Sequence, residues 1–393
     1  MTNGKRVFLA SFATIVIATG GRGQQITNTF KCEIDNYLQF TPTVLTYGLN
    51  IAGVDGRSSF TRLAASSAMS YALMVAIAQP IKHATSEMRP DRSTDDAFPS
   101  GHTATAFVGA SILHKEYGKT ISPWFSVAGY GTATATGLMR VIKNRHWAGD
   151  VLTGAGIGIV ATEIAYGLSD LIFKDKGRKR PNLPECDNNK ERPSFFGVSM
   201  GMGFSNGTLD FSSCNVRIES HTTMTASLEG AYFFTPYIGV GGRFGVGCTP
   251  MTGWEDTKMD LEVESSHLTE YTTDVGLYFS LPLNNRLAVR SKALVGGSFV
   301  DGMDINASNG SATYDYMTIE GNNSVKYGTG ISLTYAHKRN SSLTAFLDYD
   351  FTKKDYTIDV ENDNGKQHDM AKKNIGRFTL GAAFNVTFEQ QDV

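Results

Sequence analysis

The period of the hydrophobic pattern changes about halfway along the chain. From residue 37 to residue 173, the apolar residues fall in long segments rich in Ala, Ser, Gly and Leu, which is typical of helices. Two of these segments, 63–81 and 121–139, contain no charged residue. Each is long enough to cross a membrane, but their many Ser, Thr and Gly residues suit helices of a compact bundle equally well. The pattern predicts a helical domain and leaves its relation to a membrane open.

Beyond residue 195 the period becomes two. Between Phe196 and Phe204 every second residue is apolar, and the residues between them are Gly or Ser. Such alternation is typical of strands with one buried face. The segments of this kind predict eight strands, near 195–205, 222–234, 237–247, 270–282, 286–299, 326–337, 342–353 and 376–388.

The connections between these strands alternate in length. The tight ones are at 235–236, 283–285 and 338–341, and the long, polar ones are around 206–221, 248–269, 300–325 and 354–375. An even number of strands, an apolar outer face, and short turns opposite long loops are typical of a bacterial outer-membrane barrel. We therefore expect two domains, an all-α helical bundle followed by an antiparallel eight-stranded transmembrane β-barrel. A soluble antiparallel barrel of lipocalin size is the alternative.

The charged residues of the predicted strands lie on the face opposite the apolar one. They are Glu229, Arg243, Asp274, Arg290, Lys292, Asp348 and Arg377. In a barrel of eight strands this face lines a narrow interior, so we expect ion pairs that plug the lumen. The last strand ends in Phe388, which resembles the terminal aromatic residue of bacterial outer-membrane barrels, although five residues follow it here.

Changes in composition mark the domain boundaries. Lys5 and Arg6 precede an apolar run, Val7 to Ala18, which predicts an export signal over residues 1–24; a buried N-terminal helix is the alternative. A basic, proline-containing stretch begins at Lys174. The expected organisation after the signal is a helical domain at 25–173, a linker at 174–194 and a barrel at 195–393.

The barrel also indicates where the helical domain lies. A barrel whose first strand starts beside a short-turn end has its N-terminus in the periplasm. Helices in the inner membrane would then join two membranes through one short linker. We therefore expect the helical domain in the periplasm, at the outer membrane. The linker is expected to be solvated, and contact with anionic lipid headgroups is the alternative.

Overall charge and cysteine content exclude few functions. Lys and Arg number 36 against 38 Asp and Glu, and the net charge of −2 gives no general affinity for nucleic acid. The cysteines are Cys32, Cys186, Cys214 and Cys248. Their spacing is not that of a zinc site, and in an exported chain four cysteines permit disulfides of undetermined pairing. A disulfide between Cys214 and Cys248, both in expected outer loops, is one option. No metal or other cofactor is expected.

Three polar clusters interrupt the helical half. They are Lys82 with Arg89-Pro90, then Pro99-Ser100-Gly101-His102 at the start of a helical run, then Arg140 with His146 and Asp150. Three cations, Lys82, Arg89 and Arg140, can hold the nonbridging oxygens on which charge accumulates in phosphoryl transfer. Ser100 can cap the helix that follows it, and the free N–H groups beside Gly101 can face an anion.

The remaining side chains of these clusters suit proton transfer and nucleophilic attack. His146 and Asp150 are four residues apart and share one face if both lie on a helix. The carboxylate can then keep one imidazole nitrogen protonated and leave the other free to attack. His102 can protonate the leaving oxygen. Each residue alone has an ordinary structural explanation, and only the combined spacing indicates a phosphate site.

This combination resembles the signature of the type 2 phosphatidic acid phosphatase superfamily, in which K-x6-RP is followed by PSGH and SR-x5-H-x3-D. The resemblance covers about residues 37–173. It implies that His146 is a nucleophile that becomes phosphorylated, with Asp150 as its orienting partner and His102 as the general acid. It also implies phosphate binding by Lys82, Arg89, Ser100, Gly101 and Arg140. Met139 stands where the family usually has serine, so a hydroxyl contact to phosphate is lost.

The expected function is therefore a metal-independent phosphatase for phosphomonoesters or diphosphates. Its expected partners are a lipid phosphate or small phosphoester substrate and the lipid of the outer membrane. A lipid phosphate is favoured because such substrates lie in that membrane. Two alternatives are a haloperoxidase that binds vanadate, as in other members of the superfamily, and a structural or adhesive barrel with an idle phosphatase domain.

Overall fold

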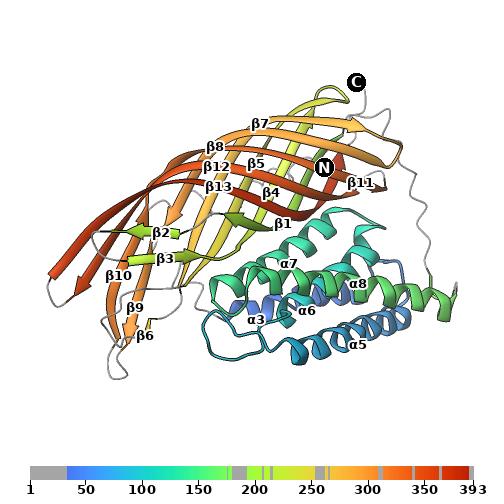
Figure 1. Ribbon diagram of the computed structural model, residues 1–393. Coiled ribbons are helices and arrows are strands. Elements are labelled where there is room, and N and C mark those ends of the chain that lie inside the picture. Colours follow the sequence, from blue (N-terminus) through green and yellow to red (C-terminus); the bar gives the residue numbers. More distant parts are fainter. Residues whose placement is uncertain are drawn as a thin grey trace. The chain divides into compact units, whose positions relative to one another are not determined.

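The computed structural model describes residues 33–174, 176–178, 193–205, 208–212, 216–252, 262–263, 266–308, 313–338, 341–362 and 365–388. The expected export signal, three of the four cysteines (Cys32, Cys186 and Cys214) and most of the expected linker lie outside these residues. The described residues form a helical domain and a β domain (Figure 1). This confirms the change of period seen in the sequence.

The helical domain follows the predicted segments. Its elements are α3 (Ile34–Leu38), α4 (Thr41–Ile51), α5 (Phe60–Thr85), α6 (Gly101–Leu113), a π-helical turn η1 (His114–Gly118), α7 (Trp124–Ile142) and α8 (Ala148–Phe173). Helix α6 contacts α4, α5, α7 and α8, and from Ala106 to Leu113 every residue of α6 is buried. It is therefore the central helix of the domain, and the helix that the expected PSGH motif opens.

Helices α6 and α8 cross closely because α8 carries glycine at the contact. A Cβ on Gly154 would lie 2.5 Å from the carbonyl oxygen of Ser100, and a Cβ on Gly158 would lie 2.5 Å from that of Ala104. The backbone N–H of Ser100 donates to the carbonyl of Asp150 at 3.0 Å. The crossing thus holds the first turn of α6 against the first turn of α8, where two of the three motifs lie.

At their other ends α5 and α8 are joined by ion pairs. Asp170 of α8 accepts from Arg57 at 2.7 Å and also from Arg62. Arg62 donates in addition to the carbonyls of Lys174 and Lys176, both at 2.9 Å. The first residues of the expected linker therefore pack on the start of α5.

Two described helices, α5 and α8, are long and apolar enough to cross a membrane by length and composition. The charge-free segment 63–81 lies in α5, as expected. The second such segment, 121–139, lies mostly in α7. Among the described helices, α7 is not apolar enough over a membrane-spanning length, whereas α8 is. Half of the most apolar segment of α8 is buried, so its composition fits a bundle helix as well as a membrane span.

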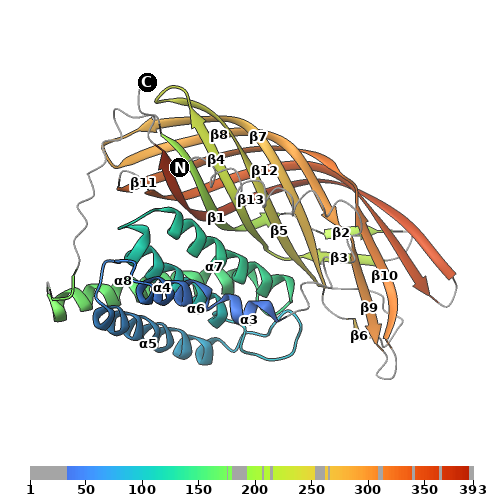
Figure 2. The ribbon, with the colours of Figure 1, turned by 180° about the vertical axis from the view of Figure 1, so that it is seen from behind.

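Eight strands of the β domain pair in a ring, called the barrel below (Figures 1 and 2). In ring order they are β1 (Ser194–Ser205), β4 (Thr223–Phe233), β5 (Ile238–Thr252), β7 (Ser266–Pro282), β8 (Leu287–Asp301), β11 (Ser324–Lys338), β12 (Ser341–Asn362) and β13 (Gly365–Phe388). Each pairs antiparallel with the next, and β13 pairs with β1. These strands correspond to the eight expected segments.

The two faces of the barrel strands differ as the alternation predicts. On β7, the side chains of Val275 and Leu281 are 65% and 58% exposed, whereas Asp274 and Tyr278 are 3% and 2% exposed. On β13, Leu380 is 56% exposed and its neighbour Thr379 is buried. The apolar face therefore points outward and the polar face lines the lumen.

The expectation that the long connections are loops is wrong in part. Strands β12 and β13 stay paired as far as Asn362 and Gly365, so 354–375 is a hairpin and not a loop. Further strands occupy the other long connections: β2 (Thr208–Phe211), β3 (Val216–Ser220), β6 (Glu262–Val263), β9 (Met303–Ser308) and β10 (Thr313–Gly321). Several of them pack around an apolar cluster that includes Phe211, Ile218, Ile319 and Ile358. The high share of polar residues in these segments concealed this alternation.

Cys248 was expected in an outer loop, but it lies within β5 as a buried free thiol. The strand β5 extends further than its predicted end at residue 247 because the residues that follow continue to pair with β7 as far as Met251. The option of a disulfide to Cys214 involves a residue outside the described part of the chain.

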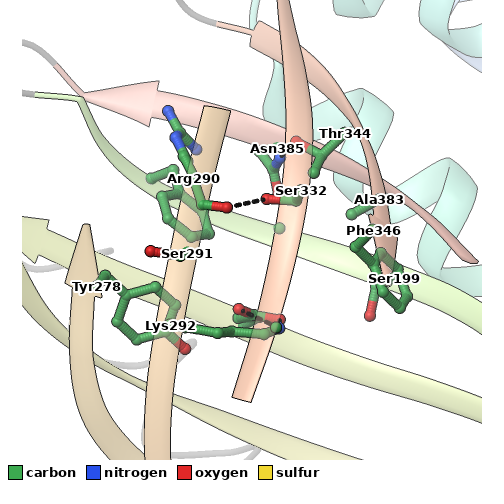
Figure 3. Close-up of a pocket in the computed structure, with 14 residues that line it drawn as sticks. Ser199, Tyr278, Arg290, Ser291, Lys292, Ser332, Thr344, Phe346, Ala383 and Asn385 are labelled. Carbon is green, nitrogen blue, oxygen red and sulfur yellow. Dashed lines mark hydrogen bonds and ion pairs between the residues drawn. The ribbon is translucent and has the colours of Figure 1, made fainter. Parts of the chain in front are cut away.

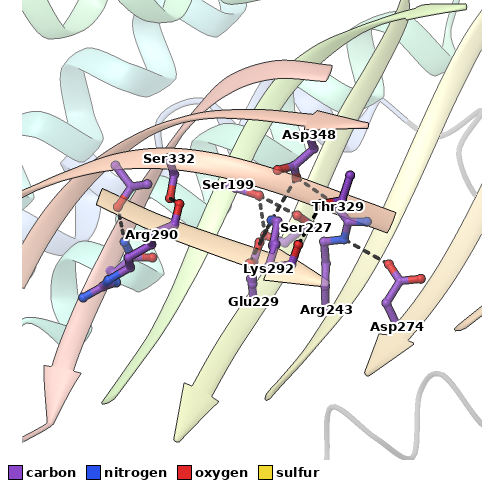
Figure 4. A network of polar contacts seen from close by, with 12 residues as sticks. Ser199, Ser227, Glu229, Arg243, Asp274, Arg290, Lys292, Thr329, Ser332 and Asp348 are labelled. Carbon is purple, nitrogen blue, oxygen red and sulfur yellow. Dashed lines mark hydrogen bonds and ion pairs between the residues drawn. The ribbon is translucent and has the colours of Figure 1, made fainter. Parts of the chain in front are cut away.

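Ion pairs fill the lumen, as expected (Figure 4). Arg243 contacts three carboxylates, at 3.0 Å for Asp274, 2.8 Å for Asp348 and 2.7 Å for Asp350. The other pairs are Lys292 with Glu229 and Asp348, Lys326 with Asp274, and Lys354 and Arg377 with Glu270. The partners lie on different strands, so these contacts tie opposite sides of the barrel together.

Candidate active site

The three motifs meet where α5 and α7 end and α6 and α8 begin. Lys82 lies in the last turn of α5 and Arg140 in the last turn of α7, whereas Gly101 and Asp150 lie in the first turns of α6 and α8. Lys82 is within electrostatic range of Arg89, Arg140 and Asp150. The structure therefore brings together residues that are up to 68 positions apart in the sequence, from 82 to 150.

His146 does not share a helix with Asp150, so the expected helical face is wrong. Helix α8 begins at Ala148, because Trp147 has extended backbone angles that interrupt the helix there. The Nδ1 atom of His146 lies 2.8 Å from the carbonyl oxygen of Ala97 and 3.5 Å from the Oδ2 atom of Asp150. Because a carbonyl oxygen only accepts, Nδ1 carries the proton and Nε2 is left unprotonated. One imidazole nitrogen is thus protonated and the other is free, as expected, but the nearer partner of Nδ1 is the Ala97 carbonyl and not Asp150.

Asp150 has a second task at the start of α8. Its Oδ2 atom accepts the backbone N–H of Trp147 at 2.8 Å. The indole N–H of Trp147 in turn donates to the carbonyl of Met88 at 3.0 Å. Asp150 therefore fixes the segment that carries His146 as well as facing the imidazole itself.

His146 is 1% exposed. Burial lowers the pKa of this imidazole below its ordinary value, and the contact with Asp150 opposes the shift only in part. His146 is therefore neutral at pH 7, which is the form that a nucleophile requires.

Two carboxylates pair with the cations of the site. Asp96 lies 2.8 Å from Arg89 and 3.8 Å from Lys82. Asp35 of α3 lies 2.8 Å from Arg140 and also binds Lys143. Each carboxylate thus lies between two cations, as a bound phosphate would.

His102 is held by the same short helix α3. Its Nε2 atom lies 3.0 Å from the Oδ1 atom of Asn36. Burial, followed by the charge of Arg140, lowers the pKa of His102 to about 4, although Asp35 opposes the shift. His102 is therefore neutral at pH 7 in this state, and a phosphate dianion beside it would raise its pKa.

Ser100 occupies the N-cap position of α6, as expected, but its hydroxyl does not cap the helix. The Oγ atom instead lies 3.0 Å from the Oγ1 atom of Thr103. A Cβ on Gly101 would meet nothing within 4 Å. Open space therefore adjoins the first turn of α6, whose N–H groups favour an anion.

Four residues of the site lie outside the three sequence motifs and could not be predicted from them. Asp35 and Asn36 lie far upstream in α3, and Lys143 and Asp96 fall between the motif positions. An Asp seven residues after Arg89 and a Lys three residues after Arg140 are ordinary in any polar loop. Among the described residues, His, Cys, Asp and Glu side chains form no group of three or more that could hold a metal ion.

The fold is a helical domain followed by a β-barrel, and residues 61–172 match the PAP2 superfamily. Every motif residue lies within the matched range. The chain is also 35% identical, over 226 residues, to the Lipid A 1-phosphatase of Porphyromonas gingivalis. That similarity covers 57% of this chain and 51% of the relative, so the chain spans about half the length of this curated relative.

Two solved structures are similar to parts of the chain. LpxE of Aquifex aeolicus is 20% identical and is matched over 40% of this chain and 94% of its own, with a TM-score of 0.29. The outer membrane protein OprG of Pseudomonas aeruginosa is 9% identical and is matched over 52% of this chain and 100% of its own, with a TM-score of 0.36.

Proposed function

We propose that the chain is a lipid phosphate phosphatase that uses His146 as its nucleophile and needs no metal. The observation that carries this proposal is the state of His146, which is buried and neutral, with Nδ1 protonated and Nε2 free, beside Arg140. The similarity to a Lipid A 1-phosphatase supports the substrate class.

The proposed reaction begins with exchange of anions. The substrate phosphate takes the positions of the Asp35 and Asp96 carboxylates beside Arg140, Arg89 and Lys82. The Nε2 lone pair of His146 then forms a bond to phosphorus while the bond from phosphorus to the ester oxygen breaks. The bound phosphate dianion raises the pKa of His102, so His102 takes up a proton from solvent and gives it to that oxygen, which leaves as an alcohol or as a phosphate.

The second half of the reaction releases phosphate. His102, now unprotonated, takes a proton from a water molecule, whose oxygen attacks the phosphorus of the phosphohistidine. The P–N bond breaks and its electron pair returns to Nε2 of His146. Inorganic phosphate leaves, and the carboxylates pair with the cations again.

We infer that this reaction takes place at the periplasmic face of the outer membrane. The outward face of the barrel is apolar and exposed, as with Val275 and Leu380, which is what a lipid-facing barrel requires. The N-terminus of β1 lies at the tight-turn end, which is periplasmic in such barrels. A lipid phosphate of that leaflet is therefore the proposed substrate.

The test measures phosphate release by the full chain in detergent micelles that contain EDTA. The substrates are a 1-phosphorylated lipid A, phosphatidic acid and a soluble aryl phosphate. We expect release from at least one lipid phosphate, undiminished by EDTA. Release that needs an added divalent ion would contradict the metal-free site, and hydrolysis of none of the three would overturn the proposal.

A further inference from the structure

Arg290 stands apart from the other charged residues of the lumen. It lies near the start of β8, at the end of the barrel with the tight turns, and is 7% exposed. Its guanidinium lies 4.7 Å from the ring centroid of Phe195 and 6.0 Å from that of Phe233. Arginine commonly packs on aromatic rings in this way, but rings do not neutralise its charge.

The lumen acids are already paired with other cations. Glu229 interacts electrostatically with Arg290, but both of its oxygens accept from Lys292 at 2.9 Å. Among the residues that the structure describes, Arg290 has no ion pair, and its Nε atom is buried without a hydrogen-bond partner. A buried charge without a partner is strongly unfavourable, so a counter-ion is expected here.

A small cavity adjoins this side chain (Figure 3). Its volume is about 30 Å³, which is room for two or three water-sized groups at about 10–15 Å³ each. Its wall is largely apolar, and its polar side chains include Tyr278, Glu229, Arg290, Lys292, Ser332, Thr344 and Asn385. Because Lys292 is already paired with Glu229, Arg290 is the cation that the cavity offers to one small ligand, together with several hydrogen-bonding groups.

We propose that this cavity is an anion site in which Arg290 binds a small oxyanion, a carboxylate or phosphate group. The planar guanidinium can donate two parallel hydrogen bonds to such a group, and the volume excludes a sugar or a hydrocarbon chain. The oxyanion is either a free ion or the headgroup of a lipid at this end of the barrel. The proposal does not depend on the phosphatase reaction.

The test follows the unfolding of the barrel in the full chain. Closed barrels run as a compact band on gels until they are heated, and the temperature at which this band is lost reports barrel stability. Inorganic phosphate replaces chloride at constant ionic strength. We expect phosphate to raise this temperature by about 5 °C in the wild type and to have no effect in Arg290→Met.

Two control variants identify the site. Arg286→Met removes an exposed arginine four residues earlier and keeps the full response. Arg140→Gln weakens phosphate binding at the proposed active site, and we expect this variant also to keep the full stabilisation of the barrel by phosphate. Loss of the response in Arg140→Gln, or an equal response in Arg290→Met and the wild type, would overturn the proposal. If Arg290→Met does not fold, Arg290→Gln takes its place. If phosphate, acetate and lipid all fail to raise the unfolding temperature of the wild type, the proposal is overturned without any variant.

A lipid arm separates the two sources of the oxyanion. Short-chain phosphatidylglycerol is added below its micelle-forming concentration, with phosphatidylcholine of the same chain length as the control. A rise at a lower concentration of phosphatidylglycerol than of phosphate assigns the site to a headgroup. A rise with phosphate and acetate but not with the lipid assigns it to a free ion. Either result supports the site, provided that Arg290→Met abolishes it.

Discussion

The molecule contains two clusters of charge that are built in different ways. In the lumen, cation and carboxylate both sit on strands of one ring, as Arg243 and Asp274 do on β5 and β7. In the helical domain, the cations lie at helix ends, but their carboxylates lie on a five-residue helix and in the connection between α5 and α6. The first cluster joins strands of the barrel and stabilises its fold. In the second, the carboxylates are the groups that a substrate phosphate would replace under the proposed function.

The largest effect is expected at the nucleophile. His146→Ala removes Nε2, so turnover should fall by at least about 10³-fold while the barrel still runs as a compact band. Acid quench of the wild type with a radioactive phosphoester should trap an acid-labile phosphoenzyme that the variant lacks. Substantial turnover in the variant would show that another residue attacks phosphorus.

A comparable change in the lumen should affect stability and spare catalysis. Arg243→Met removes the cation shared by Asp274, Asp348 and Asp350 and leaves them only Lys292 and Lys326; breaking a buried pair costs about 3–5 kcal/mol. The temperature at which the compact band is lost should fall, with little change in hydrolysis of a soluble phosphoester. Lys372→Met, which removes an exposed ion pair with Asp355 at 3.9 Å, is the control. An equal loss in both variants would mean that the lumen network is no stronger than a surface pair.

A smaller effect is expected where a substrate must displace a carboxylate. Asp35→Asn keeps the shape of the side chain and removes the charge that competes for Arg140 and Lys143. Vanadate mimics the phosphoryl centre and should inhibit this variant about tenfold more tightly. The free energy of that tenfold change is a modest share of the interaction energy of one close charge pair. Asp91→Asn, whose partner is Arg145 at 3.0 Å, should leave vanadate inhibition unchanged. Weaker inhibition in Asp35→Asn would indicate that Asp35 positions Arg140 and does not compete.

The smallest effect concerns pH. As general acid His102 must carry a proton, so kcat/KM should fall as pH rises through its pKa, which is about 4 in the free site. As nucleophile His146 must be neutral, so kcat/KM should also fall as pH drops through its lowered pKa. The optimum for a soluble ester is therefore expected on the acid side of pH 6.5. Asn36→Asp places a carboxylate beside His102 and should move the alkaline limb up by about 1 pH unit.

Asn36→Ala is the matched control for this shift, because it removes the same hydrogen bond without adding charge. Since all three proteins hydrolyse one substrate, the ionisation of the ester itself cancels from the comparison. An alkaline limb at the same pH in the Asp and Ala variants would argue against His102 as the general acid.

Much of the fold could be predicted because strand alternation and the motif spacing are local signals. The alternating segment from Phe196 to Phe204 lies in β1, and Gly101 begins the helix that the PSGH motif predicts. The partners of the motif residues could not be found in this way. Asp35 meets Arg140 only because α3 folds back on the domain, and the Ala97 carbonyl that holds His146 carries no side-chain signal at all.

The pairing of β1 with β13 has a consequence for the order of assembly. It joins Ser194 to Phe388, so the ring can close only after nearly the whole chain has been made. The helical domain needs no residue beyond 178 for its own ion pairs, so these pairs can form before the barrel strands have been made. A chain cut short within β13 would therefore keep a complete catalytic domain but leave two unpaired strand edges, which promote aggregation. The last strand is therefore the one whose loss opens the barrel while the ion pairs of the helical domain remain.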